Sequence, residues 1–230
     1  MSNFLRAGFA AIALTFVLGT FAATETNAQI NEVLKRMDTH YKALQTLRAD
    51  IKMVKYDGTL KMTEDSDIYE GKVMYLPAKG RDAYIRIDWS KPVESLAVVD
   101  KKYVVYQPRL KQAMVGNVNS TKGSAGATNP LSIINMSKEQ LKANFDIKYL
   151  GQENVGGGTP TWHLELTPNI ASTYKTSDIW VDGNGMPVQI KITENNSDST
   201  TILLTNLDKK SVINKDSFSI KLPSGTKLVK

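Results

Sequence analysis

Residues that could do nucleophilic or acid–base chemistry occur in this sequence, but their spacing does not form a catalytic motif. Two Ser-x-x-Lys matches, at residues 172–175 and 224–227, are of the kind that arises by chance at this serine and lysine content. The sequence contains no Gly-x-Ser-x-Gly, His-Glu-x-x-His or phosphate-binding loop motif. We therefore expect a protein that is not an enzyme.

Metal-binding patterns are also sparse. The 230 residues include no cysteine and only two histidines, His40 and His163, which are far apart in the sequence. Residues 182–185 (Asp-Gly-Asn-Gly) lack the repeated carboxylates of a calcium loop and predict a tight hairpin turn. His163 alternates with Trp162 and Leu164, which predicts a surface histidine on the solvent side of a strand. We expect no metal and no cofactor.

The sequence has a basic charge balance, but the distribution of its lysines argues against nucleic acid as a partner. Lys and Arg number 29 against 23 Asp and Glu, a formal net charge of +6, but the lysines are scattered along the chain. Solubility, or attraction to acidic envelope surfaces and partners, explains this charge more simply than a nucleic-acid site. We expect a monomer.

The first 28 residues have the pattern of an export signal. Residues 1–6 carry one positive charge, residues 7–23 are almost wholly apolar, and residues 26–28 or 20–22 fit the small-residue cleavage rule. The apolar run is short for a membrane span, and an uncleaved anchor is the alternative. We predict a signal peptide at 1–28 and a single domain at 29–230, exported to a bacterial periplasm.

The remaining sequence predicts one helix followed by many strands. Apolar residues from Ile30 to Leu44 recur at spacings of three and four, which is typical of a helix that covers a sheet. Alternation with period two then predicts strands with one apolar face, at residues 49–53, 83–89, 145–149, 162–166 and 188–192. Short Gly/Asn/Asp loops favour antiparallel order, and about eleven strands are too many for a flat sheet.

One insert interrupts the strands. Residues 117–128 are rich in Gly, Ser and Asn and predict a mobile loop. Asn129 and Pro130 then predict the start of a short helix. Residues 137–140 have the pattern of a capping box, which predicts a second short helix ending near Asn144.

The order of elements from Tyr69 onward resembles that of a known family. The chain reads YEGKVMYLP at 69–77, then Arg81, an aromatic strand to Trp89, and a strand that ends Tyr-Gln-Pro at 106–108. Residues 180–190 and 218–225 fit the same order. This is similar to the periplasmic outer-membrane lipoprotein carrier family (LolA-like), except that Asp82 replaces a proline and the turn at 100–102 reads Asp-Lys-Lys.

The resemblance implies a mainly β fold, an incomplete antiparallel β-barrel with the N-terminal helix and the mid-chain helices over its concave face. It implies a periplasmic chaperone that carries lipoproteins from the inner to the outer membrane and shields their acyl chains in an apolar cavity. The cavity would be lined by Ile51, Met53, Ile85, Ile87, Trp89, Trp162, Leu164 and Ile190, for each of which core packing is the alternative. The lid would carry Leu131, Ile133 and Ile134.

The resemblance also implies a latch and partners. An arginine on the sheet would hold the helical lid closed, and Arg81 is the candidate, with Lys79 as the other choice. The partners would be acylated lipoproteins, an inner-membrane ABC-type lipoprotein-releasing complex and an outer-membrane receptor, with Ile85 as an apolar contact for cargo or complex. The alternative function is an envelope protein that binds or senses another lipid or hydrophobic ligand.

Overall fold

The computed structural model describes residues 20–77, 83–117, 133 and 136–229, with side chains described from residue 26 onward. The described helices and strands form the following elements in chain order: α1 (Thr20–Ala43), β1 (Leu47–Tyr56), η1 (Asp65–Asp67), β2 (Ile68–Leu76), β3 (Tyr84–Lys91), β4 (Val93–Val99), β5 (Lys102–Gln107), η2 (Pro108–Leu110), β6 (Gln112–Asn117), α2 (Lys138–Asn144), β7 (Phe145–Val155), β8 (Thr159–Pro168), β9 (Tyr174–Asp182), β10 (Pro187–Glu194), β11 (Ser199–Asp208), η4 (Lys215–Phe218) and β12 (Lys227–Val229).

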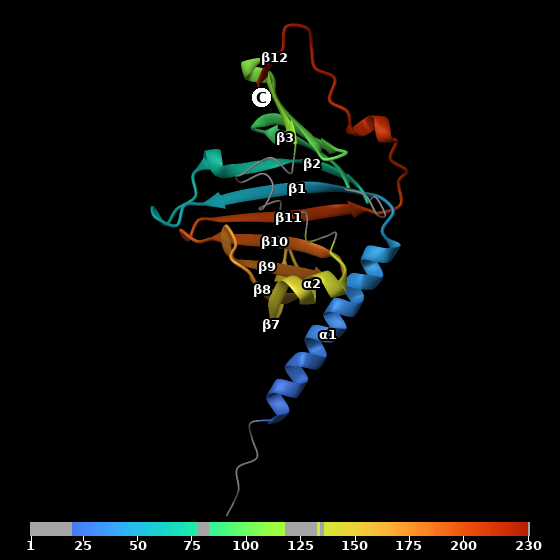
Figure 1. The fold of residues 1–230 in the computed structure, drawn as a ribbon, viewed down its shortest axis with the longest axis vertical. Helices are drawn as coiled ribbons and strands as arrows, with labels where there is room; N and C mark the ends of the chain where they lie inside the picture. Colours follow the sequence, from blue (N-terminus) through green and yellow to red (C-terminus); the bar gives the residue numbers. More distant parts are fainter. Residues whose placement is uncertain (1–19, 78–82, 118–132, 134–135, 230) are drawn as a thin grey trace, which may run out of the picture.

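All the named strands belong to a single open sheet. Its order is β12-β6-β5-β4-β3-β2-β1-β11-β10-β9-β8-β7, and the two end strands, β12 and β7, are not paired with each other. The sheet is strongly twisted, so the strands of the upper half in Figure 1 run across those of the lower half. This architecture confirms the predicted incomplete antiparallel barrel.

Two elements differ from the sequence prediction. The twelfth strand, β12, is only three residues long and pairs parallel with β6, so period-two alternation could not reveal it. Helix α1 begins at Thr20, inside the region predicted as the signal peptide, and its N-terminal half extends beyond the sheet (Figure 1).

The predicted alternation places large apolar side chains on one face of the sheet, which we call the inner face. Register pairs align them in rows that cross the strands. One row consists of Tyr149, Leu164, Ile179, Ile190, Ile202, Met53 and Tyr69. Such continuous rows require a cover, because a sheet with one apolar face is stable in water only when that face is buried.

Helices α1 and α2 provide part of this cover. Val33, Leu34 and Met37 of α1 are buried in the same core cluster as the inner face, and so is Leu141 of α2. Helix α2 begins with the predicted capping box, in which the Ser137 hydroxyl accepts from Gln140 N and the Gln140 side chain accepts from Ser137 N. The two helices pack against each other and against β7.

The turn between β9 and β10 holds α1 in place. As predicted, residues 182–185 form a tight hairpin turn, closed by a 2.9 Å bond from Gly185 N to Asp182 O. The Arg36 guanidinium of α1 donates to Gly183 O at 3.1 Å and lies 5.0 Å from the ring centre of Trp162. The backbone of α1 also passes directly over Gly185, where a Cβ atom would be 2.2 Å from Arg36 O.

Replacing Gly185 by alanine therefore tests the docking of α1. Gly185 has a φ of +85°, so an alanine there has both a strained backbone and a clash with a helix carbonyl. We expect Gly185→Ala to lower the free energy of unfolding by about 2 kcal/mol or more in urea titrations. Gly183→Ala is the matched control, because nothing lies within 4 Å of a Cβ there. Equal stability of the two variants would contradict this account of the contact.

His40 of α1 makes this docking sensitive to pH. Burial lowers the pKa of His40, and Lys209 lowers it further, while Asp182 opposes the shift. Its Nε2 atom is buried and has no hydrogen-bond partner among the described residues. The neutral ring is therefore favoured in the folded protein, while the unfolded chain takes up a proton more readily.

The free energy of unfolding should therefore decrease as the pH is lowered. The contribution of His40 is fully present above its unfolded pKa and is lost as the pH falls toward the lower folded pKa. We expect urea midpoints to drop between about pH 7.5 and pH 5.5, and His40→Gln to flatten this dependence. A wild-type pH dependence in His40→Gln would refute the assignment.

Candidate functional site

The structure brings the eight predicted lining residues together on the inner face. Ile51, Ile85, Ile87, Trp89, Leu164 and Ile190 are buried in one cluster, and Met53 and Trp162 are partly buried against it. The only described residue of the predicted lid, Ile133, is buried in the same cluster. Leu131 and Ile134, the latch candidate Arg81 and its alternative Lys79 lie outside the described residues.

Burial of the inner face differs between the two halves of the sheet. On β8 to β11 most inner-face side chains have almost no exposure, with Leu164 and Ile179 at 0% and Ile190 at 1%, while Trp162 is partly buried. In this conformation Leu164 and Ile190 are therefore packed as core residues. Contact of either with a ligand requires that the covering helices move.

Toward the other end of the sheet the inner face becomes more exposed among the described residues. One row runs through Ala49, Val73, Ile87, Leu96, Val105 and Met114. Its first three members are at most 5% exposed, Leu96 and Val105 are half-buried, and Met114 is 38% exposed. The neighbouring row, from Leu47 through Tyr75 and Ile85 to Val98 and Tyr103, shows the same trend.

We call the partly exposed part of these rows the β4–β6 patch; it consists of Leu96, Val98, Tyr103, Val105 and Met114. The sequence prediction missed these residues because β4 and β5 are apolar on both faces, so alternation selects neither. On the outer face, η4 of the segment at 209–226 packs against β3 and β4.

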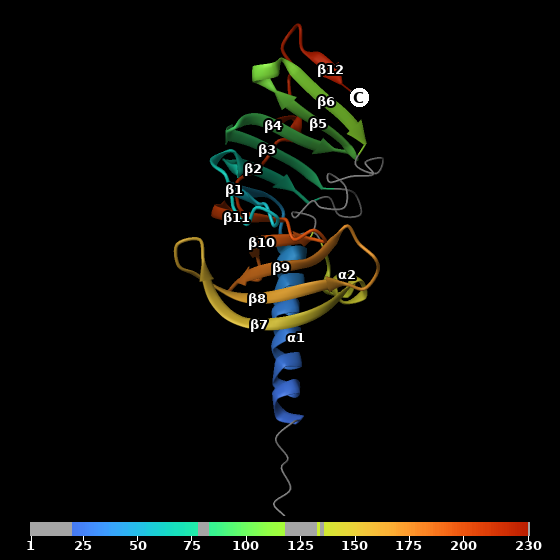
Figure 2. The ribbon, with the colours of Figure 1, turned by 90° about the vertical axis from the view of Figure 1, so that its left-hand side faces the viewer.

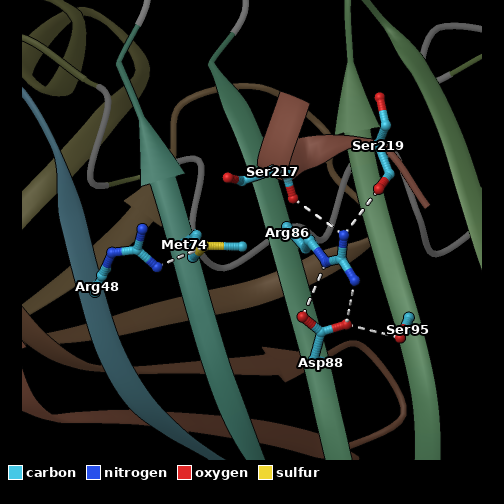
Figure 3. A network of polar contacts seen from close by, with 7 residues as sticks. All are labelled: Arg48, Met74, Arg86, Asp88, Ser95, Ser217 and Ser219. Carbon is cyan, nitrogen blue, oxygen red and sulfur yellow. Dashed lines mark hydrogen bonds and ion pairs between the residues drawn. The ribbon is translucent and has the colours of Figure 1, made fainter. Parts of the chain in front are cut away.

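Phe218 is the anchor of that covering segment. Its side chain is fully buried and meets the Tyr84 ring edge to face, at 5.8 Å between ring centres. Arg86 fixes the backbone on both sides of it, because Nη1 donates to Ser217 O at 3.0 Å and to Ser219 O at 2.8 Å (Figure 3).

The Arg86 side chain is itself oriented by a carboxylate. Its Nε and Nη2 donate to the two oxygens of Asp88, and Ser95 donates to the same carboxylate at 2.7 Å (Figure 3). Arg48 and Met74 lie beside this network on the same face. Arg86 therefore fastens η4 and Ser219, which cover the outer face of the sheet.

Two buried hydroxyls of the inner face, those of Tyr75 and Ser177, have no hydrogen-bond partner among the described residues. Tyr75 is paired with Leu47 and Ile85 in the register of the sheet. Burial raises the pKa of Tyr75 well above its usual value, so the phenol remains neutral. A buried hydroxyl without a partner costs free energy, which a hydrogen bond donated to the carbonyl of a ligand would offset.

His163 is less accessible than the sequence predicted. It does lie on the outer face, but only 17% of its side chain is exposed. Its Nδ1 is 2.8 Å from Glu153 Oε1, its Nε2 is 2.8 Å from Asp178 Oδ1, and the ring stacks on Trp180. The predicted position on the solvent side of the strand is therefore confirmed, and both ring nitrogens are paired with carboxylates.

The outer face also carries a shallow polar pocket of about 610 Å³ over β1, β2 and β3. Its charged groups already pair with one another, as in the 2.7 Å contact between Lys72 and Asp50. The described residues contain no group of three metal-ligating side chains. No described helix combines the length and the apolar character needed to cross a bilayer.

Comparison with solved structures finds similar folds. An uncharacterised conserved protein from Thermus thermophilus has 11% identity and a TM-score of 0.54, over 88% of this chain and 98% of that one. A putative outer membrane lipoprotein-sorting protein domain from Vibrio parahaemolyticus has 13% identity and a TM-score of 0.45, over 85% and 97%. The lipoprotein LppX of Mycobacterium tuberculosis has 12% identity and a TM-score of 0.47, over 82% and 99%.

Sequence comparison gives the family. None of the curated protein sequences matches the chain. The family described as outer membrane lipoprotein carrier protein LolA matches residues 76–221, which is more than half of the chain and includes the β4–β6 patch. The chain therefore belongs to the LolA family of outer membrane lipoprotein carrier proteins.

Proposed function

We propose that this protein is a periplasmic chaperone that carries lipoproteins from the inner to the outer membrane and holds their acyl chains against the inner face. Family membership supports the class of cargo, since the family is described as an outer membrane lipoprotein carrier. The observation that carries the proposal is the rise in exposure from Ala49 to Met114 along one apolar row.

The energetics explain why acyl chains fit such a face. Each methylene group removed from water contributes about 0.8 kcal/mol, so one long acyl chain gains on the order of 10 kcal/mol on burial. Leucine, valine and methionine side chains supply an apolar surface without hydrogen-bond requirements. The neutral Tyr75 hydroxyl would give the lipid ester a single polar partner.

Loading beyond the β4–β6 patch requires the covers to move. Helix α2 has seven residues and one buried side chain, Leu141, and its Lys142 contacts Asn31 of α1 at 2.7 Å. Such a short helix is held by few contacts, so it is the first part of the cover expected to open. Movement of α1 would then uncover Trp162, Leu164 and Ile190, which complete the predicted lining.

The proposal includes the latch and the partners. Arg81 would hold the lid, which carries Leu131, Ile133 and Ile134, in the closed state. An inner-membrane ABC-type complex would load the carrier, with Ile85 as an apolar contact, and an outer-membrane receptor would accept the cargo.

Substitution within the β4–β6 patch tests the cargo site. Val98→Glu places a carboxylate among apolar side chains, and acyl chains packed against it would strip it of water. We expect the affinity for a fluorescent triacylated lipopeptide to fall by at least about tenfold. Val212→Glu is the matched control, because Val212 is 90% exposed and should tolerate the charge.

The latch is tested in parallel. Arg81→Leu should bind the lipopeptide but transfer cargo poorly from inner-membrane vesicles, while its thermal unfolding is unchanged. Wild-type transfer by Arg81→Leu would remove the latch assignment.

Equal lipopeptide affinity in Val98→Glu and the wild-type protein would remove the acyl-chain site. Preference for a phospholipid over the lipopeptide would instead support the alternative, a protein that binds another envelope lipid.

A further inference from the structure

Three hairpin loops at one end of the strands carry exposed aliphatic side chains at their tips. The loops join β1 to β2, β3 to β4 and β5 to β6, and Figure 2 shows them one above another along one edge. We call their tip residues the loop rim: Leu60, Met62, Val93 and Leu110, with exposures of 63%, 46%, 55% and 66%. A single exposed aliphatic residue is ordinary, but their concentration along one edge is not.

Each tip of the loop rim is accompanied by basic residues. Lys61 lies between Leu60 and Met62 in the sequence, and Arg109 and Lys111 flank Leu110. Lys91 comes two residues before Val93. These four basic side chains are exposed, and none forms an ion pair with another residue in the described part of the chain.

The first of these loops is held in its protruding shape by its own hydrogen bonds. The Asp57 carboxylate accepts from Thr59 N at 2.8 Å and from Leu60 N at 2.7 Å, and the backbone of Asp57 pairs with that of Met62. The loop also packs on its neighbour, since a Cβ on Gly58 would be 2.4 Å from the backbone of Ser197. Leu60 and Met62 are therefore presented to solvent without a large further loss of conformational entropy on binding.

The loop between β5 and β6 is equally well defined. Leu110 ends the short helix η2, and Lys111 follows in a left-handed conformation with a φ of 46°. Lys111 N donates to Pro108 O at 3.1 Å, and Lys111 O accepts from Lys227 N of β12 at 2.9 Å. Leu110 is therefore held exposed to solvent, with a basic residue on each side of it in the sequence.

Acidic residues are also present near the loop rim, but they lie closer to the strands. Asp65 and Asp67 belong to η1, directly before β2, and the side chains of Glu64 and Asp67 are engaged in the capping box of that helix. Glu94 follows Val93 into β4 and accepts from Gln107 at 2.8 Å. The Asp57 carboxylate of the first loop is engaged by Thr59 N and Leu60 N, so the charged residues next to Leu60, Met62 and Leu110 in the sequence are the basic Lys61, Arg109 and Lys111.

We propose that the loop rim docks this protein reversibly on an anionic lipid surface. Aliphatic side chains with adjacent cations suit the boundary between acyl chains and acidic headgroups, where the cations remain at the surface. Separate convex tips do not form the continuous apolar core that a protein interface buries. Docking of this kind does not depend on the proposed cargo, although it would bring the β4–β6 patch, in the same half of the sheet, toward the membrane.

Site-specific fluorescence tests the proposal. Because the chain contains no cysteine, single cysteines at Leu60, Val93 or Leu110 can each be labelled with the environment-sensitive probe NBD. Ile170→Cys and Val212→Cys are the controls, since these residues are 80% and 90% exposed and lie outside the loop rim. The vesicles are phosphatidylethanolamine with about 30% phosphatidylglycerol, with phosphatidylcholine vesicles for comparison.

We expect the NBD emission to rise about threefold or more and to shift to the blue at the three tips with anionic vesicles, and to remain unchanged at the control sites. High salt should reverse the effect, because it screens the surface charge. No change at the tips, or equal changes at tips and controls, would overturn the proposal. A rise that depends on protein concentration without vesicles would also overturn it, in favour of contact between two copies.

Removal of the charges provides the second test. Lys61→Gln combined with Arg109→Gln should weaken partitioning onto the anionic vesicles by about fivefold for each charge in flotation experiments. Both side chains are exposed, so the fold should be retained, which thermal unfolding verifies. Partitioning equal to that of the wild-type protein would overturn an anionic surface as the partner.

Discussion

The rest of the structure depends on one constraint: an open sheet with an apolar inner face must cover that face or leave it available. The two end strands of the sheet, β12 and β7, are not paired, so closure of the barrel does not bury the inner face. Helices α1 and α2 bury it over β8 to β11, while the described residues leave the β4–β6 patch partly exposed. A partly exposed apolar face of this extent is typical of a binding surface.

The two faces of the upper half are covered in different ways. On the outer face, Phe218 is fully buried and Arg86 bonds to the backbone on both sides of it, so this cover is fixed by directional contacts. On the inner face, α2 packs against β7 and α1 at the opposite end of the sheet. The outer face of the upper half therefore has a fixed support, while its inner face is partly exposed among the described residues.

Much of this arrangement could be predicted from the sequence, and the exceptions have physical causes. Alternation correctly grouped Ile51, Ile87 and Leu164 on one face, because each of their strands has a polar opposite face. It failed for β4 and β5, which are apolar on both faces, and η4 with Phe218 packs on the outer face of β3 and β4. Contacts between segments far apart in the sequence leave no local pattern, so neither this cover nor the parallel pairing of β12 could be predicted.

Local signals succeeded where the structure is determined by neighbours in the chain. The capping box at Ser137 and the tight turn that ends at Gly185 form as their residue types predict. The environment of His163 was missed because its partners, Glu153 and Asp178, come from the two adjacent strands. The positions of Arg81, Leu131 and Ile134 lie outside the described residues, so their roles stay predictions.

The central claim is that the inner face of the sheet holds acyl chains, and the most direct measurement is mass spectrometry of the lipids and proteins that copurify with this chain from its native cells. The account predicts acylated lipoproteins bound in a defined ratio and released by detergent. Protein recovered from the same cells without any acylated molecule, while lipoproteins still reach the outer membrane after its depletion, would contradict it.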